Sequence, residues 1–157
     1  MRAVILRSAG MVLGIVACSS DSVPAPANLS GTWNFSYTTT SDAGAACQGA
    51  MTFTISQTDQ TFVGFQRNTG TLSCTGVTLA VASPNPSNPT EFDGEMISSG
   101  VVSPTNVAFQ LNTLRGQDAG TVAANGTMMG TSTWTLPVEP NGTITVTGTW
   151  TAIRQNQ

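Results

Sequence analysis

The sequence predicts an all-β protein, an antiparallel meander β-barrel of about eight or nine strands, with a β-sandwich as the alternative fold. Apolar and polar residues alternate with a period of two in run after run, as in the segment WNFSY at 33–37. This alternation is typical of antiparallel strands that keep one face in water. The chain is also rich in Thr, Gly, Ser and Val, and β-branched residues favour strands over helices. Many short strands must close into a barrel or stack as two sheets.

The alternating runs and the turn signals between them fix the expected strands. Asn125-Gly126 and Asn141-Gly142 each separate two runs and are typical of hairpin turns, in which Gly adopts a positive φ. Prolines at positions 84, 86 and 89 prevent strand pairing, so residues 82–90 are expected to form a loop. A bulge is expected at Thr75-Gly76. We therefore predict strands at 31–39, 47–57, 61–67, 71–81, 91–102, 106–113, 119–125, 127–136 and 143–154.

Strand alternation also predicts which side chains point into the barrel. An eight-stranded barrel is just wide enough to be filled by side chains or to hold one small ligand. Inward aromatic side chains are therefore candidates for lining a pocket for a small apolar molecule, and a core that they fill themselves is the alternative. The residues expected inside are Trp33, Phe35, Phe53, Phe109, Trp134, Ile144, Val146 and Trp150. The candidate ligand-lining residues among them are Phe35, Phe53, Phe109, Trp134 and Trp150.

The N-terminus predicts export. Arg2 and Arg7 precede an uncharged run from Ser8 to Ala17, which is the pattern of a secretory signal peptide with a small residue before the cleavage site. The run is too short to span a bilayer, which needs about 20 apolar residues. Residues 1–17 are therefore predicted to be a signal peptide, and a buried N-terminal strand or helix is the alternative.

The residues that follow predict a membrane anchor. The stretch Ile15-Val16-Ala17-Cys18 resembles the lipobox of bacterial lipoproteins, and the resemblance implies that Cys18 carries lipid such as palmitate. Several acyl chains give stable membrane anchoring. Ser19 after the cysteine implies, by the same resemblance, the outer membrane, with the protein facing the periplasm or the surface. Residues 18–29 are small, polar and Pro-containing, as in a flexible tether, and 30–157 form the predicted domain.

Composition excludes several functions. The chain has no His, and of its five cationic residues only Arg67, Arg115 and Arg154 lie beyond the predicted signal peptide. Nucleic-acid binding needs a basic footprint, so no nucleic-acid partner is expected. Catalysis lacks its commonest general base, and we predict no enzyme activity, no cofactor and no metal site.

Cys47 and Cys74 remain once Cys18 is assigned to lipid. An even pair in an exported chain predicts a disulfide, which would stabilise the fold by about 3–4 kcal/mol in the chain-entropy model. Two separate buried thiols are the alternative.

Gly31 and Trp33 open the first predicted strand, and Arg154 ends the last. First and last strands are neighbours in a meander barrel, so Arg154 is expected to lie across the Trp33 ring as a cation–π contact. These three residues resemble the pattern of the calycins, the superfamily of lipocalins, fatty-acid-binding proteins and avidins. The resemblance implies a lipocalin-like barrel in which Gly31, Trp33 and Arg154 close one end.

Three carboxylates alternate along residues 91–95 (EFDGE) and are expected to project from one face of a strand. Calcium takes oxygen ligands, but alternate strand residues lie nearly 7 Å apart, so a solvated face is expected.

The whole sequence thus predicts an envelope lipoprotein that binds a small apolar ligand inside its barrel. The alternative is a structural or interaction protein with a filled barrel, which a solid core and an exposed apolar patch would favour.

Overall fold

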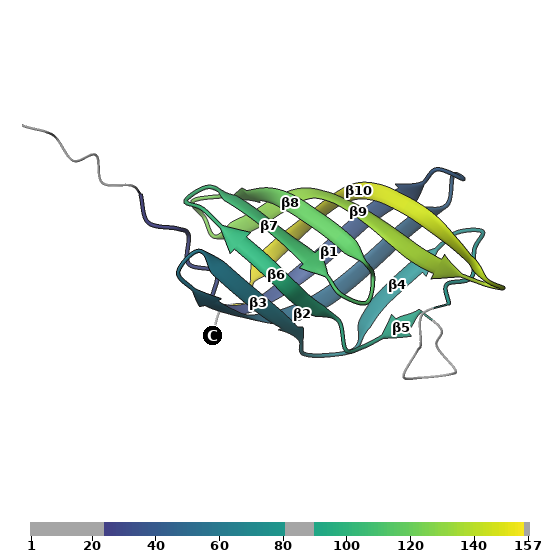
Figure 1. Ribbon diagram of the computed structural model, residues 1–157, viewed down its shortest axis with the longest axis horizontal. Helices are drawn as coiled ribbons and strands as arrows, with labels where there is room; N and C mark the ends of the chain where they lie inside the picture. The colour runs from purple at the N-terminus through teal and green to yellow at the C-terminus, as the bar shows by residue number, and fades with distance from the viewer. Residues whose placement is uncertain (1–23, 81–89, 156–157) are drawn as a thin grey trace, which may run out of the picture.

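The computed structural model describes residues 24–80 and 90–155, and within these ranges the protein contains ten β-strands and no helix (Figure 1). The predicted signal peptide, Cys18 and most of the Pro-rich loop lie outside the described residues. The strands are β1 (Gly31–Ser41), β2 (Ala46–Thr58), β3 (Thr61–Gln66), β4 (Gly70–Cys74), β5 (Glu91–Phe92), β6 (Met96–Val102), β7 (Asn106–Leu111), β8 (Gly116–Val122), β9 (Thr127–Val138) and β10 (Gly142–Arg154).

Eight of these strands form a closed antiparallel barrel. The pairing order β1-β10-β9-β8-β7-β6-β3-β2 returns to its start because β1 also pairs with β2. Strands β4 and β5 lie outside this ring: β4 pairs with the first half of β2, on the edge that β3 occupies along the second half, and β5 pairs with β4. The barrel fold with meander connections is therefore confirmed, and the β-sandwich is wrong.

Two predicted strands are shorter than the alternation suggested. The strand expected at 71–81 ends at Cys74, and the one expected at 91–102 is divided into β5 and β6 by residues 93–95. The division follows from Gly94, whose φ of 74° lies in the left-handed region that a strand does not use. The hairpin between β9 and β10 turns at residues 139–141, so Gly142 begins β10 and supplies no positive φ.

The side chains predicted to point inward form the core. All of them are buried except Ile144, which packs against the core from a half-buried position. Gly116 on β8 faces Trp134 on β9, and a Cβ at this glycine would lie 2.1 Å from the indole Cδ1. The absence of a side chain at Gly116 therefore leaves the space that the Trp134 indole occupies. Burial of each large apolar side chain contributes about 1.5–3 kcal/mol, so the interior is the main source of stability.

One end of the barrel, which we call the tether end, receives the N-terminal segment (Figure 1). Trp33 donates a hydrogen bond from Nε1 to the Leu29 carbonyl at 2.7 Å, and the Arg154 guanidinium carbon lies 4.9 Å from the Trp33 ring centroid. Arg154 also donates to the Asn28 carbonyl, and the Ala27 amide donates to the Ser103 carbonyl at 3.2 Å. Residues 27–29, which the sequence predicts to be part of the tether, are thus packed onto the barrel, and the expected cation–π contact is confirmed.

The opposite, far end is crossed by residues 75–80, which we call the strap. Cys47 on β2 pairs directly with Cys74 on β4, and the predicted disulfide joins them. The chain then reaches β9, where Leu79 bridges Val138 and the Ala80 amide donates to the Pro137 carbonyl at 2.9 Å. In the ring of eight, β9 lies opposite the sheet position that β3 and β4 share. The strap therefore passes over the far end, with Leu79 against the core.

Candidate functional site

The barrel interior is occupied by an aromatic cluster. Phe35 lies at its centre, with its ring centroid 5.4 Å from that of Phe53, 5.8 Å from Phe109 and 5.7 Å from Trp150. Phe109 and Trp150 also meet at 5.4 Å. Edge-on and tilted contacts of this kind each add about 0.5–1.5 kcal/mol to simple burial. Four of the five candidate lining residues therefore contact one another across the lumen, and each is at most 3% exposed.

Trp134, the fifth candidate, belongs to a second, more polar group toward the far end. Its ring centroid lies 4.6 Å from that of Tyr37, and its Nε1 donates to Asp118 Oδ2 at 3.3 Å. Ser132 donates to the other oxygen of this carboxylate at 2.7 Å. Sequence reasoning missed Asp118 because the strand predicted to begin at 119 begins at Gly116. The signal that could have identified Asp118 is the alternation of Gly116 and Asp118, which point inward, with Gln117, which points outward.

The electrostatics of this group follow from its burial. Removal from water raises the pKa of Asp118 to about 6; hydrogen bonds from Ser132 and Trp134 oppose the rise, and the Glu95 charge adds to it. Burial also raises the pKa of Tyr37 well above its usual 10, with smaller contributions from the two carboxylates. Within the described residues, the Tyr37 hydroxyl and Thr39 Oγ1 are buried without a hydrogen-bond partner.

Glu95 is a structural group of the barrel wall. Its carboxylate accepts hydrogen bonds from the backbone amides of Met96 and Thr113 at Oε1, at 2.9 and 2.8 Å, and of Leu114 at Oε2, at 2.9 Å. It thereby joins the start of β6 to the turn between β7 and β8. The expectation of three carboxylates on one strand face is wrong, since Glu95 is fully buried while Asp93 is exposed. Among the described residues, no three His, Cys, Asp or Glu side chains gather as a metal site would require.

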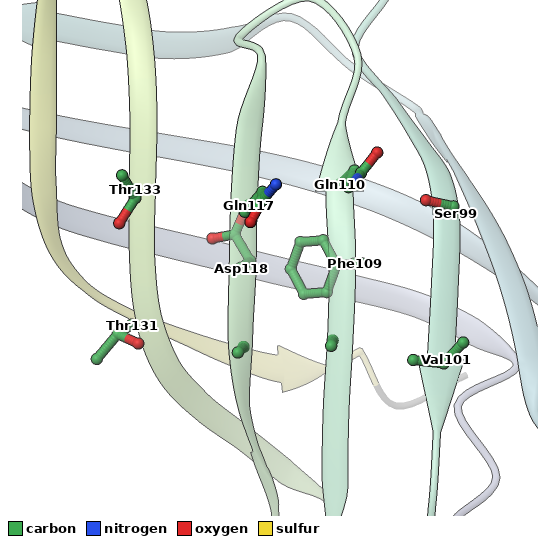
Figure 2. A pocket seen from close by; sticks show the side chains of 10 residues that line it. Ser99, Val101, Phe109, Gln110, Gln117, Asp118, Thr131 and Thr133 are labelled. Carbon is green, nitrogen blue, oxygen red and sulfur yellow. The ribbon is translucent and has the colours of Figure 1, made fainter.

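The outer wall carries the open hollows. One of them has a volume of about 440 Å³. It lies across four neighbouring strands, β6 to β9 (Figure 2). A second hollow of about 500 Å³ lies nearer the tether end and shares three lining residues with the first. The shared residues are Val101, Ala108 and Ala119. Outward side chains that the first hollow adds include Ser99, Gln110, Gln117, Thr131 and Thr133.

No known family model matches the chain, and no curated protein matches it in sequence. Membership of the calycins and of the bacterial lipoproteins therefore stays a prediction. Over residues 24–80 and 90–155 there is no helix of the length and apolarity needed to cross a membrane.

Proposed function

We propose that this protein is a lipid-anchored lipoprotein of the bacterial envelope that acts through the outer surface of a filled barrel. The observation that carries this proposal is the aromatic cluster, in which the candidate lining residues occupy the lumen themselves. Both barrel ends are also covered, by Trp33 and Arg154 at the tether end and by the strap at the far end. A core packed in this way leaves the wall as the working surface.

The proposed location rests on the sequence and is supported by the disulfide. Disulfides persist in oxidising compartments such as the periplasm and are rare in the cytosol, and Cys47–Cys74 is formed here. Cleavage before Cys18, its acylation and retention at the outer membrane complete the proposal. Its partners are lipid at the anchor and an envelope component at the wall, with no nucleic acid, cofactor or catalytic step.

The anchor is tested in cells that express the full chain. Feeding an alkyne-labelled palmitate should label the wild-type protein, and Cys18→Ser should abolish the label while leaving the Cys47–Cys74 bridge intact. Fractionation should place the wild type with the outer membrane. Wild-type protein that is unlabelled and soluble in the periplasm would refute the anchor.

A ligand in the lumen is the second candidate, because Tyr37 and Thr39 keep buried hydroxyls that the polar end of a small, mostly apolar ligand would satisfy. Native mass spectrometry of the chain from Ser19 onward, exported to the periplasm, distinguishes the two. A bare mass, two hydrogens below that of the reduced chain, is expected for the filled barrel. A discrete extra mass, lost on denaturation and weakened by Trp134→Ala, would favour the ligand.

A further inference from the structure

The outer wall exposes several large apolar side chains, and most of them gather at the tether end. Val63 is 40% exposed, Val101 55%, Met129 52% and Ile153 60%. Val101 pairs with Ala108, which pairs in turn with Ala119, so small apolar residues continue the surface across β7 and β8. We call these six residues, Val63, Val101, Ala108, Ala119, Met129 and Ile153, the apolar band.

The position of the band along the strands is regular. Val63 is two residues from the tether end of β3, Val101 one from that of β6, Met129 two from that of β9 and Ile153 one from that of β10. With a rise of about 3.3 Å per residue, these side chains lie within about 7 Å of their strand ends. The outward residues of β1 are Thr or small polar residues instead, as at Asn34 and Ser36. The band therefore runs around the tether end over six of the eight ring strands and leaves out β1 and β2.

Charged side chains are few at the tether end and more numerous at the far end. Among the described residues near the tether end the only charged side chains are Asp59 in the β2–β3 turn and Arg154, whose guanidinium lies over Trp33. The far end holds exposed Asp42, Arg115 and Glu139 in its turns. Placing a charge in a medium of low dielectric is costly, so the tether end is the end suited to an apolar surface.

We infer that the apolar band seats the barrel in the interfacial region of the membrane that holds its lipid anchor. The inference rests on the proposed acylation of Cys18 and adds to it an orientation of the domain. Cys18 precedes Ala27 by nine residues, and Ala27 is fixed at the tether end by hydrogen bonds with Ser103 and Gln57. Nine extended residues span at most about 30 Å, which holds the tether end within reach of the bilayer.

The seated geometry follows from the two surfaces. The strands that carry the band, β3 and β6 through β10, face the lipid headgroups, and the side chains of Met129 and Ile153 lie among the headgroups. The polar outer faces of β1 and β2 face water. Apolar side chains bind at the headgroup boundary in proportion to the area they bury. The charged turns of the far end point away from the membrane.

The first experiment tests the band without the anchor. The core and its closure lie within residues 27–154, so the chain from Ser19 onward keeps the fold. Its partition into phosphatidylethanolamine–phosphatidylglycerol vesicles is measured for the wild type, for Met129→Glu with Ile153→Glu, and for Thr135→Glu with Thr147→Glu as the matched control. The control places the same charges on exposed positions of the same two strands toward the far end. The band variant should lose at least about tenfold in partition coefficient and the control less than about twofold.

The second experiment uses the full acylated protein in the same vesicles, with a lipid-soluble diazirine probe and peptide mass spectrometry. Labelling at Met129 and Ile153 should exceed that at Thr135 and Thr147 at least about threefold, since only the band meets the acyl boundary. Equal labelling on a chain whose Cys18 carries lipid would overturn the inference and leave the anchor standing. No acyl mass on Cys18 would overturn both. Self-association through the band, with no vesicle binding, would also overturn the inference.

Discussion

Asp118→Asn tests whether a buried carboxyl makes the barrel less stable as the pH rises. The side chain is 2% exposed and is held by Ser132 and Trp134. Its pKa is about 6 in the folded chain, against an ordinary 3.8. Between these values the folded state keeps a proton that the unfolded state has lost, so the free energy of unfolding falls as pH rises through this window.

The size of the effect follows from the two pKa values. One unit of pKa difference corresponds to 1.36 kcal/mol, and the gap between 3.8 and about 6 corresponds to about 3 kcal/mol. This contribution is fully present below pH 3.8 and is lost as the pH rises through about 6. Asparagine does not titrate, so the variant should lack this part of the pH dependence.

Urea unfolding at about pH 4 and at about pH 7 measures the difference. The free energy of unfolding of Asp118→Asn, relative to wild type, should rise by about 2.4 kcal/mol between the two conditions, because the unfolded carboxyl is already partly ionised at pH 4. The exposed Asp93→Asn removes a similar carboxyl from the surface and should show little change. If Asp118→Asn differs from wild type by the same amount at both pH values, the raised pKa and the burial argument behind it are wrong.

Further substitutions test the rest of the architecture. Phe35→Ala removes the centre of the aromatic cluster and should cost about 3–5 kcal/mol in urea unfolding; a loss below about 1 kcal/mol would indicate a loosely filled lumen. Cys47→Ala with Cys74→Ala opens a loop of 27 residues and should cost about 3.5 kcal/mol, with unchanged thermal unfolding as the contrary result. Glu95→Gln turns an acceptor of three backbone amides into a partial donor and should cost about 2–4 kcal/mol, measured by denaturant unfolding. Unchanged stability would contradict its structural role. Arg154→Met keeps the apolar stem and should cost about 1–2 kcal/mol through loss of the Trp33 and Asn28 contacts. Hydrogen exchange at Leu29 and Trp33 should rise with it, and unaltered protection would refute the closing role.

Alternation was sufficient to identify an all-β antiparallel protein and the inner face of its strands, and the calycin-like pattern of Gly31, Trp33 and Arg154 favoured a barrel over a sandwich. Each strand of a barrel presents every second residue to the core, so Phe35, Phe53 and Trp150 could be placed inside without knowledge of their neighbours. The pairing of Cys47 with Cys74 followed from their number and expected compartment. The contact of Arg154 with Trp33 followed from the adjacency of first and last strands in a meander.

The errors arose where backbone conformation changes within a run. Gly94 interrupts the strand that alternation carries through 91–102, and this shift turns Glu95 inward. No periodic pattern shows such a break, because glycine is compatible with both conformations. The sequence likewise predicts a strand over the strap. Its path across the far end depends on a contact with Val138, which is far away in sequence and leaves no local pattern.

The sequence by itself thus determined an all-β antiparallel protein, its inward residues and its disulfide, since local alternation and residue chemistry suffice for these. The closed ring of eight strands is confirmed by the tertiary structure. Only the tertiary structure decided that Phe35, Phe109 and Trp150 meet across the lumen, and that Asp118 is buried beside Trp134. It alone gathered the apolar band at the end where the chain enters. Packing distance and the position of a residue around a closed ring depend on the register of all eight strands at once, and no local pattern contains that information.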